Sequence, residues 1–183
     1  MISTPEVNIT VTYQVRTRAI CLALLGGSTA PTLTFTLLAG CGSEGSSCGP
    51  SSGVVARVID GDTIELETGE RIRYLLVNAP ETTGGKNECY GQNASQFNTD
   101  LVLGKTVELQ YDSVCTDRFG RLLAYVSVDG TEVNTTLVER GYVCILHIPP
   151  DGDARVAEFK ALETAAKQQL RGLWGACSPI PCN

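Results

Sequence analysis

Residues 54–66 read VVARVIDGDTIEL, and apolar and polar residues alternate on both sides of the Asp-Gly pair. Alternation with a period of two is typical of β-strands, and Asp-Gly is a common turn between paired strands. The stretch therefore predicts strands at 54–60 and 62–67. A second turn, TGE, leads into RIRYLLV, which predicts a third strand at 71–77.

The same signals predict two more strands and three helices farther along the chain. In chain order we expect a helix at 92–103, strands at 105–111 and 121–128, and helices at 135–140 and 154–171. Asn134 is placed to cap the short helix, and the buried face of the last helix is expected to include Phe159, Leu162 and Leu170. Five closely spaced strands can close into a barrel, which leaves no exposed edge. We therefore expect an α+β domain.

The composition limits the chemistry that this chain can carry. Of its 183 residues, 43% are hydrophobic and 19% are charged, which is typical of a folded domain. A single histidine, His147, excludes a two-histidine ribonuclease site or a histidine-rich zinc site within one chain. The net charge of −6 argues against nucleic-acid binding by the whole surface but allows a local basic cleft. Acid–base chemistry must come mainly from carboxylates.

The beginning of the chain resembles an export signal at 1–41. Residues 19–41 carry no charge, and Arg16 and Arg18 precede them. The run ends in LAGC, which resembles the lipobox of bacterial lipoproteins, in which the cysteine is lipidated; ordinary signal cleavage is the alternative. We expect an exported protein, either a cell-envelope lipoprotein or a periplasmic or extracellular protein, with membrane contact only through Cys41.

A short segment and six cysteines follow this signal. Residues 42–53, GSEGSSCGPSSG, predict a flexible linker. The six cysteines beyond the signal favour disulfides in an exported chain, although the spacing does not choose among the many pairings. One guess joins Cys48 to Cys182, near the two ends of the mature chain. No CxxC pair occurs, which argues against a thiol-redox site or a zinc ribbon.

Polar residues at the ends of strands form a set with a common chemistry. Asp62 is a hard oxygen ligand suited to calcium or magnesium, and Asn78 adds a neutral oxygen. Glu81 is a candidate base, while Arg73 and Arg121 can each bind a phosphate through two N–H groups. Each residue alone has an ordinary structural explanation. The combination suits hydrolysis of a phosphodiester bond assisted by a cation.

Four stretches carry a family resemblance: VVARVIDGDTIEL, RIRYLLVNAPE, DRFGRLLAYVSVDGTEVNTTLVERGY and GLWGAC. In order and spacing they resemble staphylococcal nuclease and its relatives, the thermonuclease family. The resemblance spans 54–177 and leaves a short tail at 178–183. It implies an OB-fold, a five-stranded β-barrel with three helices. It also implies a calcium-dependent nuclease that cleaves DNA and RNA to 3′-phosphate and 5′-hydroxyl ends.

The resemblance assigns roles by matching position. Asp62 corresponds to a metal ligand, and Arg73 and Arg121 correspond to the two arginines that contact the phosphate. Glu81 corresponds to the glutamate described as the general base, which can instead position water and order its loop. Asp117 is expected to shape the loop that presents Arg121.

One position departs from the family pattern. Relatives commonly have an aspartate ligand where this chain has Asn78, which keeps an oxygen but loses a charge. We therefore predict weaker calcium binding, with the backbone carbonyl of Ala79 as a further ligand. Asp60 is expected to lie beside the metal ligands without being one. The alternative functions are a catalytically weakened OB-fold module that binds nucleic acid and a structural envelope lipoprotein.

Substrate binding is expected to be simple. The motifs contain residues suited to contact phosphate but no set of residues that would distinguish the bases. We therefore expect binding of DNA and RNA with little sequence preference. We also expect the protein to be a monomer. Phe119 and Tyr90 are candidates for stacking on bases, although each could equally pack in the core. His147 is more simply a loop residue than a site residue. Trp174 is expected to anchor the C-terminal segment by packing.

Overall fold

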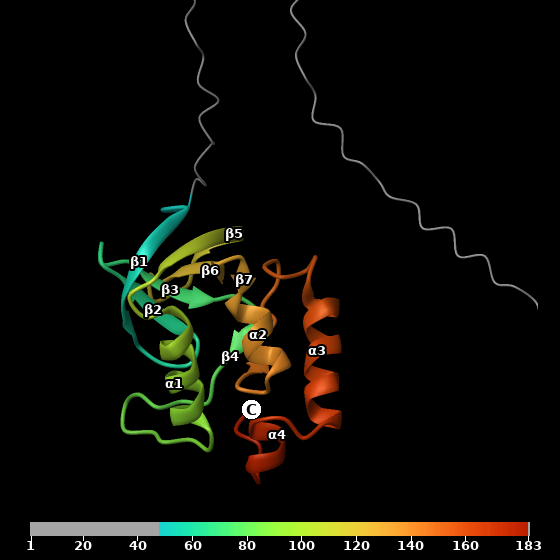
Figure 1. The fold of residues 1–183 in the computed structure, drawn as a ribbon. Coiled ribbons are helices and arrows are strands. Elements are labelled where there is room, and N and C mark those ends of the chain that lie inside the picture. Colours follow the sequence, from blue (N-terminus) through green and yellow to red (C-terminus); the bar gives the residue numbers. More distant parts are fainter. Residues whose placement is uncertain (1–47, 183) are drawn as a thin grey trace, which may run out of the picture. The chain divides into compact units, whose positions relative to one another are not determined.

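The computed structural model describes residues 48–182, so the predicted signal at 1–41 and the first part of the predicted linker lie outside the described residues. Five strands form a closed barrel (Figure 1). They are β1 (Ser52–Val58), β2 (Thr63–Leu66), β3 (Arg71–Tyr74), β5 (Thr106–Thr116) and β6 (Leu122–Val128). Antiparallel pairing follows the order β3-β2-β1-β5-β6, and parallel pairing of β3 with β6 closes the sheet. The predicted five-stranded OB-fold barrel is confirmed.

Three short strands were not predicted. They are β4 (Val77–Asn78), β7 (Thr131–Glu132) and β8 (Cys144–Ile145). The run predicted as one strand at 71–77 divides because Leu76 adopts a φ of 61°, which turns the chain out of the barrel. β4 then pairs with β8 in a separate two-stranded sheet. The sequence pattern does not indicate where this strand breaks, because Leu75 and Leu76 are as apolar and as buried as their neighbours.

The three predicted helices are present, together with a fourth, shorter one. They are α1 (Gly91–Val102), α2 (Val133–Glu139), α3 (Val156–Gln168) and α4 (Leu173–Ala176). α2 packs against β6 and against α3 (Figure 1). The prediction that Leu170 lies on the buried face of the last helix is wrong, because α3 ends before it and leaves it 68% exposed. Phe159 is fully buried, as that face predicts.

Asn134 does not cap the second helix, because that helix begins at Val133, two residues before the predicted start, and its N-cap is Glu132. The side chain of Asn134 is instead buried. Its Oδ1 accepts a hydrogen bond from the Val126 amide at 2.9 Å, and its Nδ2 donates to the carbonyls of Leu75 and Ala124 at 2.9 and 3.4 Å. The residue therefore joins the end of β3 to β6.

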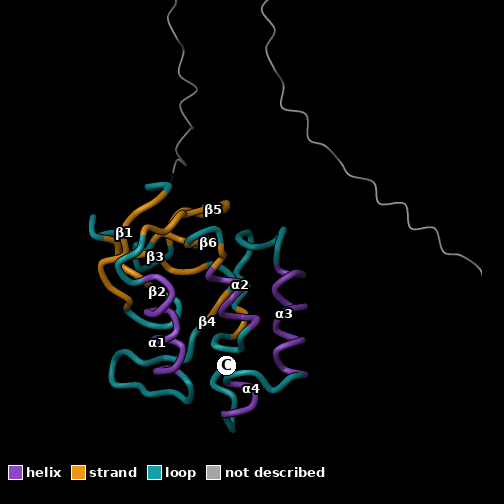
Figure 2. Tube along the Cα trace, in the orientation of Figure 1, coloured by secondary structure: helices purple, strands orange, loops and turns teal. Residues whose placement is uncertain are grey.

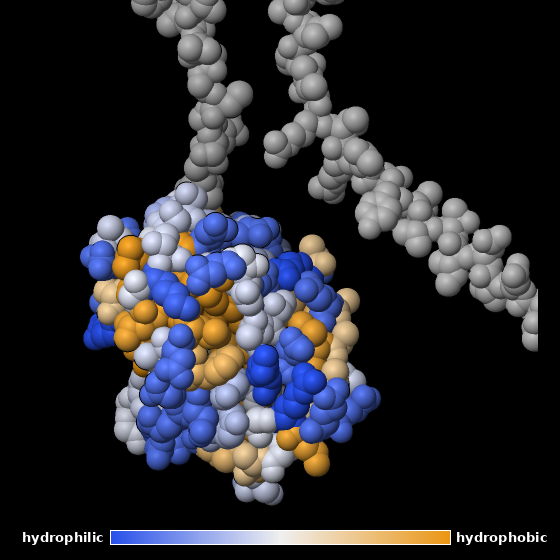
Figure 3. All heavy atoms as spheres, in the orientation of Figure 1, coloured by the Kyte–Doolittle hydropathy of each residue, from blue (hydrophilic) through white to orange (hydrophobic). Residues whose placement is uncertain are grey.

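One main core fills the barrel and continues under α2 and α3. Its largest fully buried side chains include Tyr74, Phe159, Ile64, Leu66 and Ile72. Hydrophilic residues cover α1 and much of α3 on the outside, as amphipathic helices require (Figure 3). A second, smaller cluster forms around Leu173, and Trp174 packs against it. The packing role predicted for Trp174 is confirmed.

Three disulfides join Cys48 to Cys115, Cys89 to Cys177, and Cys144 to Cys182. The guessed bond between Cys48 and Cys182 is therefore wrong. Both ends of the described chain belong to the folded domain. Residues 52 and 53 of the predicted linker pair with β5, and the disulfide of Cys182 joins the C-terminal tail to Cys144. No helix within residues 48–182 is both long and apolar enough to cross a membrane.

Candidate active site

A cleft of about 680 Å³ contains every residue that the sequence nominated for catalysis or metal binding. Those six residues are Asp62, Arg73, Asn78, Ala79, Glu81 and Arg121. They come from the β1–β2 turn, from β3 and β4, from the loop before α1, and from the start of β6. Figure 2 shows the loop before α1, which carries Glu81, as a long connection. The barrel therefore brings together residues up to 59 positions apart in the chain.

Arg73 is buried at the centre of this arrangement. Its Nη1 donates to the carbonyls of Tyr74 and Val77, both at 2.7 Å. Its Nη2 lies 3.1 Å from Asp62 Oδ2 and donates to Asn78 Oδ1 at 3.2 Å. These contacts occupy both terminal nitrogens. A phosphate can therefore bind Arg73 at Nε–H, or at Nη2 once that nitrogen releases one of its partners.

Arg121 is held from its own loop. Its Nε donates to Asp117 Oδ2 at 2.7 Å, and its Nη2 lies 2.6 Å from the same oxygen. Within residues 48–182, its Nη1 makes only a long hydrogen bond of 3.5 Å to Thr63 Oγ1, so this nitrogen can donate to an anion in the cleft. Burial alone would raise the pKa of Asp117, but the hydrogen bonds from Arg121 and from backbone amides outweigh it and lower the pKa. The prediction that Asp117 shapes this loop agrees with these contacts.

Two aspartates lie close together at the β1–β2 turn. The amide of Asp62 donates to Asp60 Oδ1 at 3.0 Å. Burial, with the neighbouring Asp62 carboxylate as the second cause, raises the pKa of Asp60 to about 7. Asp62 Oδ2 accepts the Ala79 amide at 2.6 Å, which fixes the backbone of Ala79 beside this carboxylate. An oxygen-rich site is thus formed around Asp62.

The donor set fits a hard divalent cation. Asp62 Oδ1 accepts one hydrogen bond, from Thr63, and so keeps capacity for a further partner. Among the residues that the structure describes, Asn78 Oδ1 likewise accepts a hydrogen bond only from Arg73. Within residues 48–182, no three His, Cys, Asp or Glu side chains gather closely enough to hold a metal by themselves. A cation here would depend on Asp62, the Asn78 amide oxygen, the Ala79 carbonyl and water.

Glu81 is tied to its own loop through one oxygen. Its Oε1 accepts the amides of Thr82 and Thr83 at 3.0 and 2.8 Å and the Thr83 hydroxyl at 2.5 Å. Burial would raise the pKa of Glu81, but these hydrogen bonds outweigh it and lower the pKa. The carboxylate is therefore ionised at neutral pH. Its other oxygen accepts no hydrogen bond from the part of the chain that the structure describes and is left for water.

One wall of the cleft was not predicted. It is apolar and comes from the segment after β8, with Leu146, Ile148 and Pro149 in its lining. His147 is not among the residues that line the cleft, and its Nε2 lies 2.8 Å from Asp153 Oδ1. The interpretation of His147 as a loop residue, and not a site residue, therefore agrees with the structure. The exposure of Leu146 and Ile148 around it gave no periodic signal in the sequence.

The two aromatic candidates differ. Tyr90 packs against Tyr142, with ring centroids 5.5 Å apart, and lies outside the cleft lining. Phe119 lines the cleft and is 69% exposed. Only Phe119 of this pair is thus placed to meet a ligand in the cleft.

Comparisons with known proteins agree with this geometry. The family model described as staphylococcal nuclease homologue matches residues 71–176. Endonuclease YncB of Bacillus subtilis (strain 168) is 38% identical over 125 residues, which cover 64% of this chain and 59% of that protein. The SPbeta prophage-derived endonuclease YokF of the same organism is 36% identical over 125 residues, covering 64% of this chain and 42% of that protein.

A third relative is matched over most of its length. The thermonuclease of Staphylococcus intermedius is 35% identical over 126 residues, which cover 66% of this chain and 74% of that protein. By contrast, the chain spans only about half the length of the two Bacillus relatives. The family model covers more than half of the chain, and the matched region includes five of the six predicted site residues. The chain belongs to the staphylococcal nuclease family.

Proposed function

We propose that this protein is a calcium-dependent nuclease that hydrolyses phosphodiester bonds of DNA and RNA to 3′-phosphate and 5′-hydroxyl ends. One observation carries the proposal: a single cleft holds two arginines, a carboxylate with an uncommitted oxygen and an oxygen-rich cation site. All six residues come from one chain, so we further propose that a monomer is sufficient. The names of the relatives as endonucleases and thermonuclease support the same activity.

The contacts of each residue suggest its role in the reaction. Arg121 presents Nη1 to the scissile phosphate, and Arg73 adds Nε–H from the floor of the cleft. Both guanidiniums stabilise the negative charge that grows on the phosphate oxygens as the bond to water forms. Glu81 orients the attacking water through its free oxygen and accepts its proton as the water oxygen bonds to phosphorus. The bond from phosphorus to the 5′ oxygen breaks, and this oxygen takes a proton from solvent to become the 5′-hydroxyl. The lowered pKa of Glu81 makes it a weak base, so positioning is the larger part of its contribution.

Calcium would be held by Asp62, Asn78 and Ala79. When bound there, it would neutralise charge on the phosphate and favour the ionised form of a nearby water. The neutral amide of Asn78 lowers the ligand charge compared with a carboxylate. We therefore propose weak calcium binding, which suits a medium rich in calcium.

A cleavage assay tests the proposal. Supercoiled plasmid is incubated with the protein and calcium, with and without a chelator, using wild type, Glu81→Gln and Glu67→Gln. Glu67 is exposed on the turn after β2 and serves as the matched control. We expect cleavage by wild type and Glu67→Gln, loss of cleavage with chelator, and a fall of about a hundredfold or more in Glu81→Gln.

The alternative makes the opposite prediction. A nucleic-acid-binding module would shift plasmid or oligonucleotide mobility without cleaving it, and a structural lipoprotein would do neither. Either result with folded wild-type protein and millimolar calcium overturns the nuclease proposal. The chemistry of the ends is read by labelling the products: a 5′-hydroxyl accepts a phosphate label without prior dephosphorylation, whereas a 5′-phosphate does not.

We also propose that the protein is exported and anchored by lipid at Cys41. The three disulfides support an oxidising compartment, because such bonds are rare in proteins of a reducing cytosol. Labelling of cells with a radioactive fatty acid tests the anchor. Wild type should carry the label and Cys41→Ala should not. Label in neither protein would contradict the lipid anchor.

A further inference from the structure

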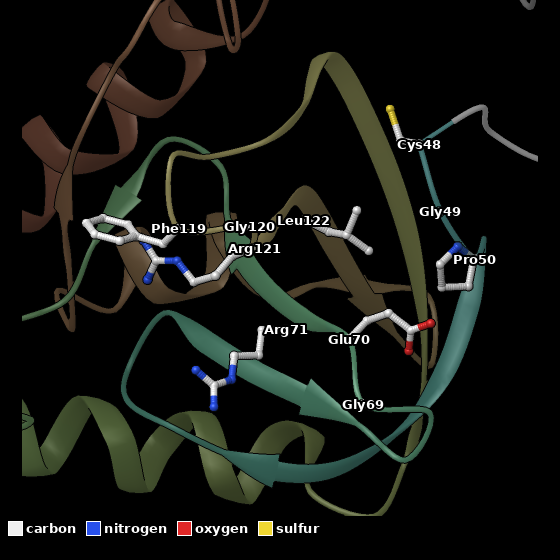
Figure 4. A pocket seen from close by; sticks show the side chains of 10 residues that line it. All are labelled: Cys48, Gly49, Pro50, Gly69, Glu70, Arg71, Phe119, Gly120, Arg121 and Leu122. Carbon is white, nitrogen blue, oxygen red and sulfur yellow. The ribbon is translucent and has the colours of Figure 1, made fainter.

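A second pocket, of about 450 Å³, adjoins the cleft. It is lined by three segments: residues 48–50, the turn at 69–71, and residues 119–122 (Figure 4). Phe119 and Arg121 line both hollows, so the pocket begins where the cleft ends. Neither the metal site nor Glu81 reaches this pocket. It is therefore surplus to the cleavage chemistry itself.

Because β3 pairs with β6, a third arginine lies beside the two arginines of the cleft and lines the second pocket. Ile72 lies opposite Leu122, so Arg71, the first residue of β3, and Arg121, the residue just before β6, lie at the same end of two neighbouring strands. Arg71 and Arg73 are alternate residues of β3 and so project from the same face, about 6.6 Å apart along the strand. Arginines therefore line both the cleft and the second pocket, which suits a polyanion that extends from one into the other.

Arg71 retains capacity for an anion. Its Nε donates to Glu65 Oε2 at 3.1 Å, but the same oxygen also accepts Arg57 Nη2 at 2.9 Å. One carboxylate cannot neutralise two guanidiniums, so this group keeps a net positive charge. The side chain of Arg71 is 59% exposed. In Figure 4 its guanidinium lies toward the Arg121 end of the pocket, whereas the Glu70 carboxylate lies toward Pro50.

Phe119 lies at the junction of the two hollows and presents an exposed ring. Its amide donates to Asp117 Oδ1 at 2.8 Å, which fixes the loop that carries it. The guanidinium carbons of Arg118 and Arg121 lie 4.7 and 5.4 Å from the ring centroid. An exposed aromatic ring between cations can stack on a base of any identity, provided that the base is unpaired.

We propose that the second pocket is a subsite for the nucleotide next to the scissile phosphate, with Arg71 binding its phosphate and Phe119 stacking on its base. The inference rests on the proposed nuclease activity and defines its substrate as a single strand that extends past the cleft. Arg71 is then a specificity residue for chain length. It distinguishes a polynucleotide from a short ester that fills the cleft alone.

The test compares substrates within each variant. A dinucleotide with one cleavable bond is extended by two nucleotides on the 5′ side or on the 3′ side, and kcat/KM is measured for all three substrates. In wild type, extension on one side should raise kcat/KM. In Arg71→Ala, the ratio of the extended to the short substrate should fall about three- to tenfold. Because each ratio is internal to one protein sample, a loss of folded protein cancels.

Arg57→Ala is the matched control. It removes the same charge from the same Glu65 partner but lies outside both hollows, so its ratio should equal that of wild type. Binding of the extended strand should also lose about 0.7 units of salt dependence in Arg71→Ala only. Equal ratios in Arg71→Ala, Arg57→Ala and wild type overturn the subsite alone. Failure of wild type to cleave any substrate overturns the activity, and the subsite with it.

Discussion

Asp117 holds Arg121 in two ways at once. Its Oδ2 accepts Arg121 Nε at 2.7 Å, while its Oδ1 accepts the amides of Phe119 and Arg121 at 2.8 and 3.1 Å. One oxygen thus directs the guanidinium, and the other closes the turn that carries it. We propose that Asp117 is a positioning residue that acts through Arg121 and does not itself need to touch substrate.

The substitution Asp117→Asn separates these two functions. The asparagine side chain keeps an oxygen for the backbone amides but offers Arg121 an N–H group instead of a charged acceptor. We expect kcat/KM for DNA cleavage to fall about ten- to a hundredfold, because a small displacement of a catalytic group is costly. If the structural role were the only one, cleavage would fall only in proportion to folded protein. Equal activity per folded molecule, with folding measured by circular dichroism, would contradict this account.

The same substitution changes the pH dependence of stability. The folded-state pKa of Asp117 is lower than its ordinary value of 3.8, so this carboxylate stabilises the fold above that pH, and the contribution is lost as the pH falls through the lowered pKa. The variant Asp117→Asn lacks the titrating group. The difference in urea midpoint between wild type and variant should therefore be present at pH 6 and shrink below pH 3.8. A constant difference across this range would argue against an ionised Asp117.

Asn78→Asp should strengthen calcium binding. The aspartate would keep the oxygen that accepts Arg73 Nη2 and would add a negative charge beside Asp62. We expect the calcium concentration for half-maximal cleavage to fall about tenfold, since affinity follows ligand charge. Asn93→Asp, which adds the same charge on an exposed position of α1, should leave it unchanged. An unchanged calcium requirement in Asn78→Asp would contradict the metal assignment.

The residues of the cleft could be predicted because each lies in a short motif, in or beside a strand that the sequence pattern also predicts. Asp62 follows an Asp-Gly turn, Arg73 lies within an alternating strand, and Glu81 follows a proline in a loop. Each is recognisable without knowing which strand pairs with which. The barrel then brings them together, and barrel closure itself follows from the number and spacing of the strands.

The features that were missed depend on contacts between distant segments. The second pocket needs residues 48–50, which reach it because Cys48 is joined to Cys115, and no spacing rule reveals that pairing. β4 and β8 have two residues each, too few to show any period. Asn134 looks like a helix cap because its neighbours are helical, whereas its partners lie on the barrel.

Thr83 should affect catalysis through Glu81. Its hydroxyl donates to Glu81 Oε1 at 2.5 Å, so Thr83→Ala removes one of three hydrogen bonds that hold this carboxylate. We expect kcat to fall about three- to tenfold, with KM little changed, because the water would be oriented less often. Thr82→Ala is the matched control, since Thr82 bonds to Glu81 through its backbone amide. Equal kcat values for the two variants would show that Glu81 does not need this bond.

Asn134 provides the sharpest test of the fold. In Asn134→Ala the Val126 amide and the Leu75 carbonyl lose their buried partner, and each such group costs about 1–3 kcal/mol. We expect the free energy of unfolding to fall by about 3 kcal/mol or more in urea titrations. Asn134→Ser tests the bridge directly, because the serine hydroxyl is polar but too short to span these distances. It should be nearly as unstable as the alanine variant. If serine instead restores wild-type stability, the bridge that Asn134 makes between β3 and β6 contributes little.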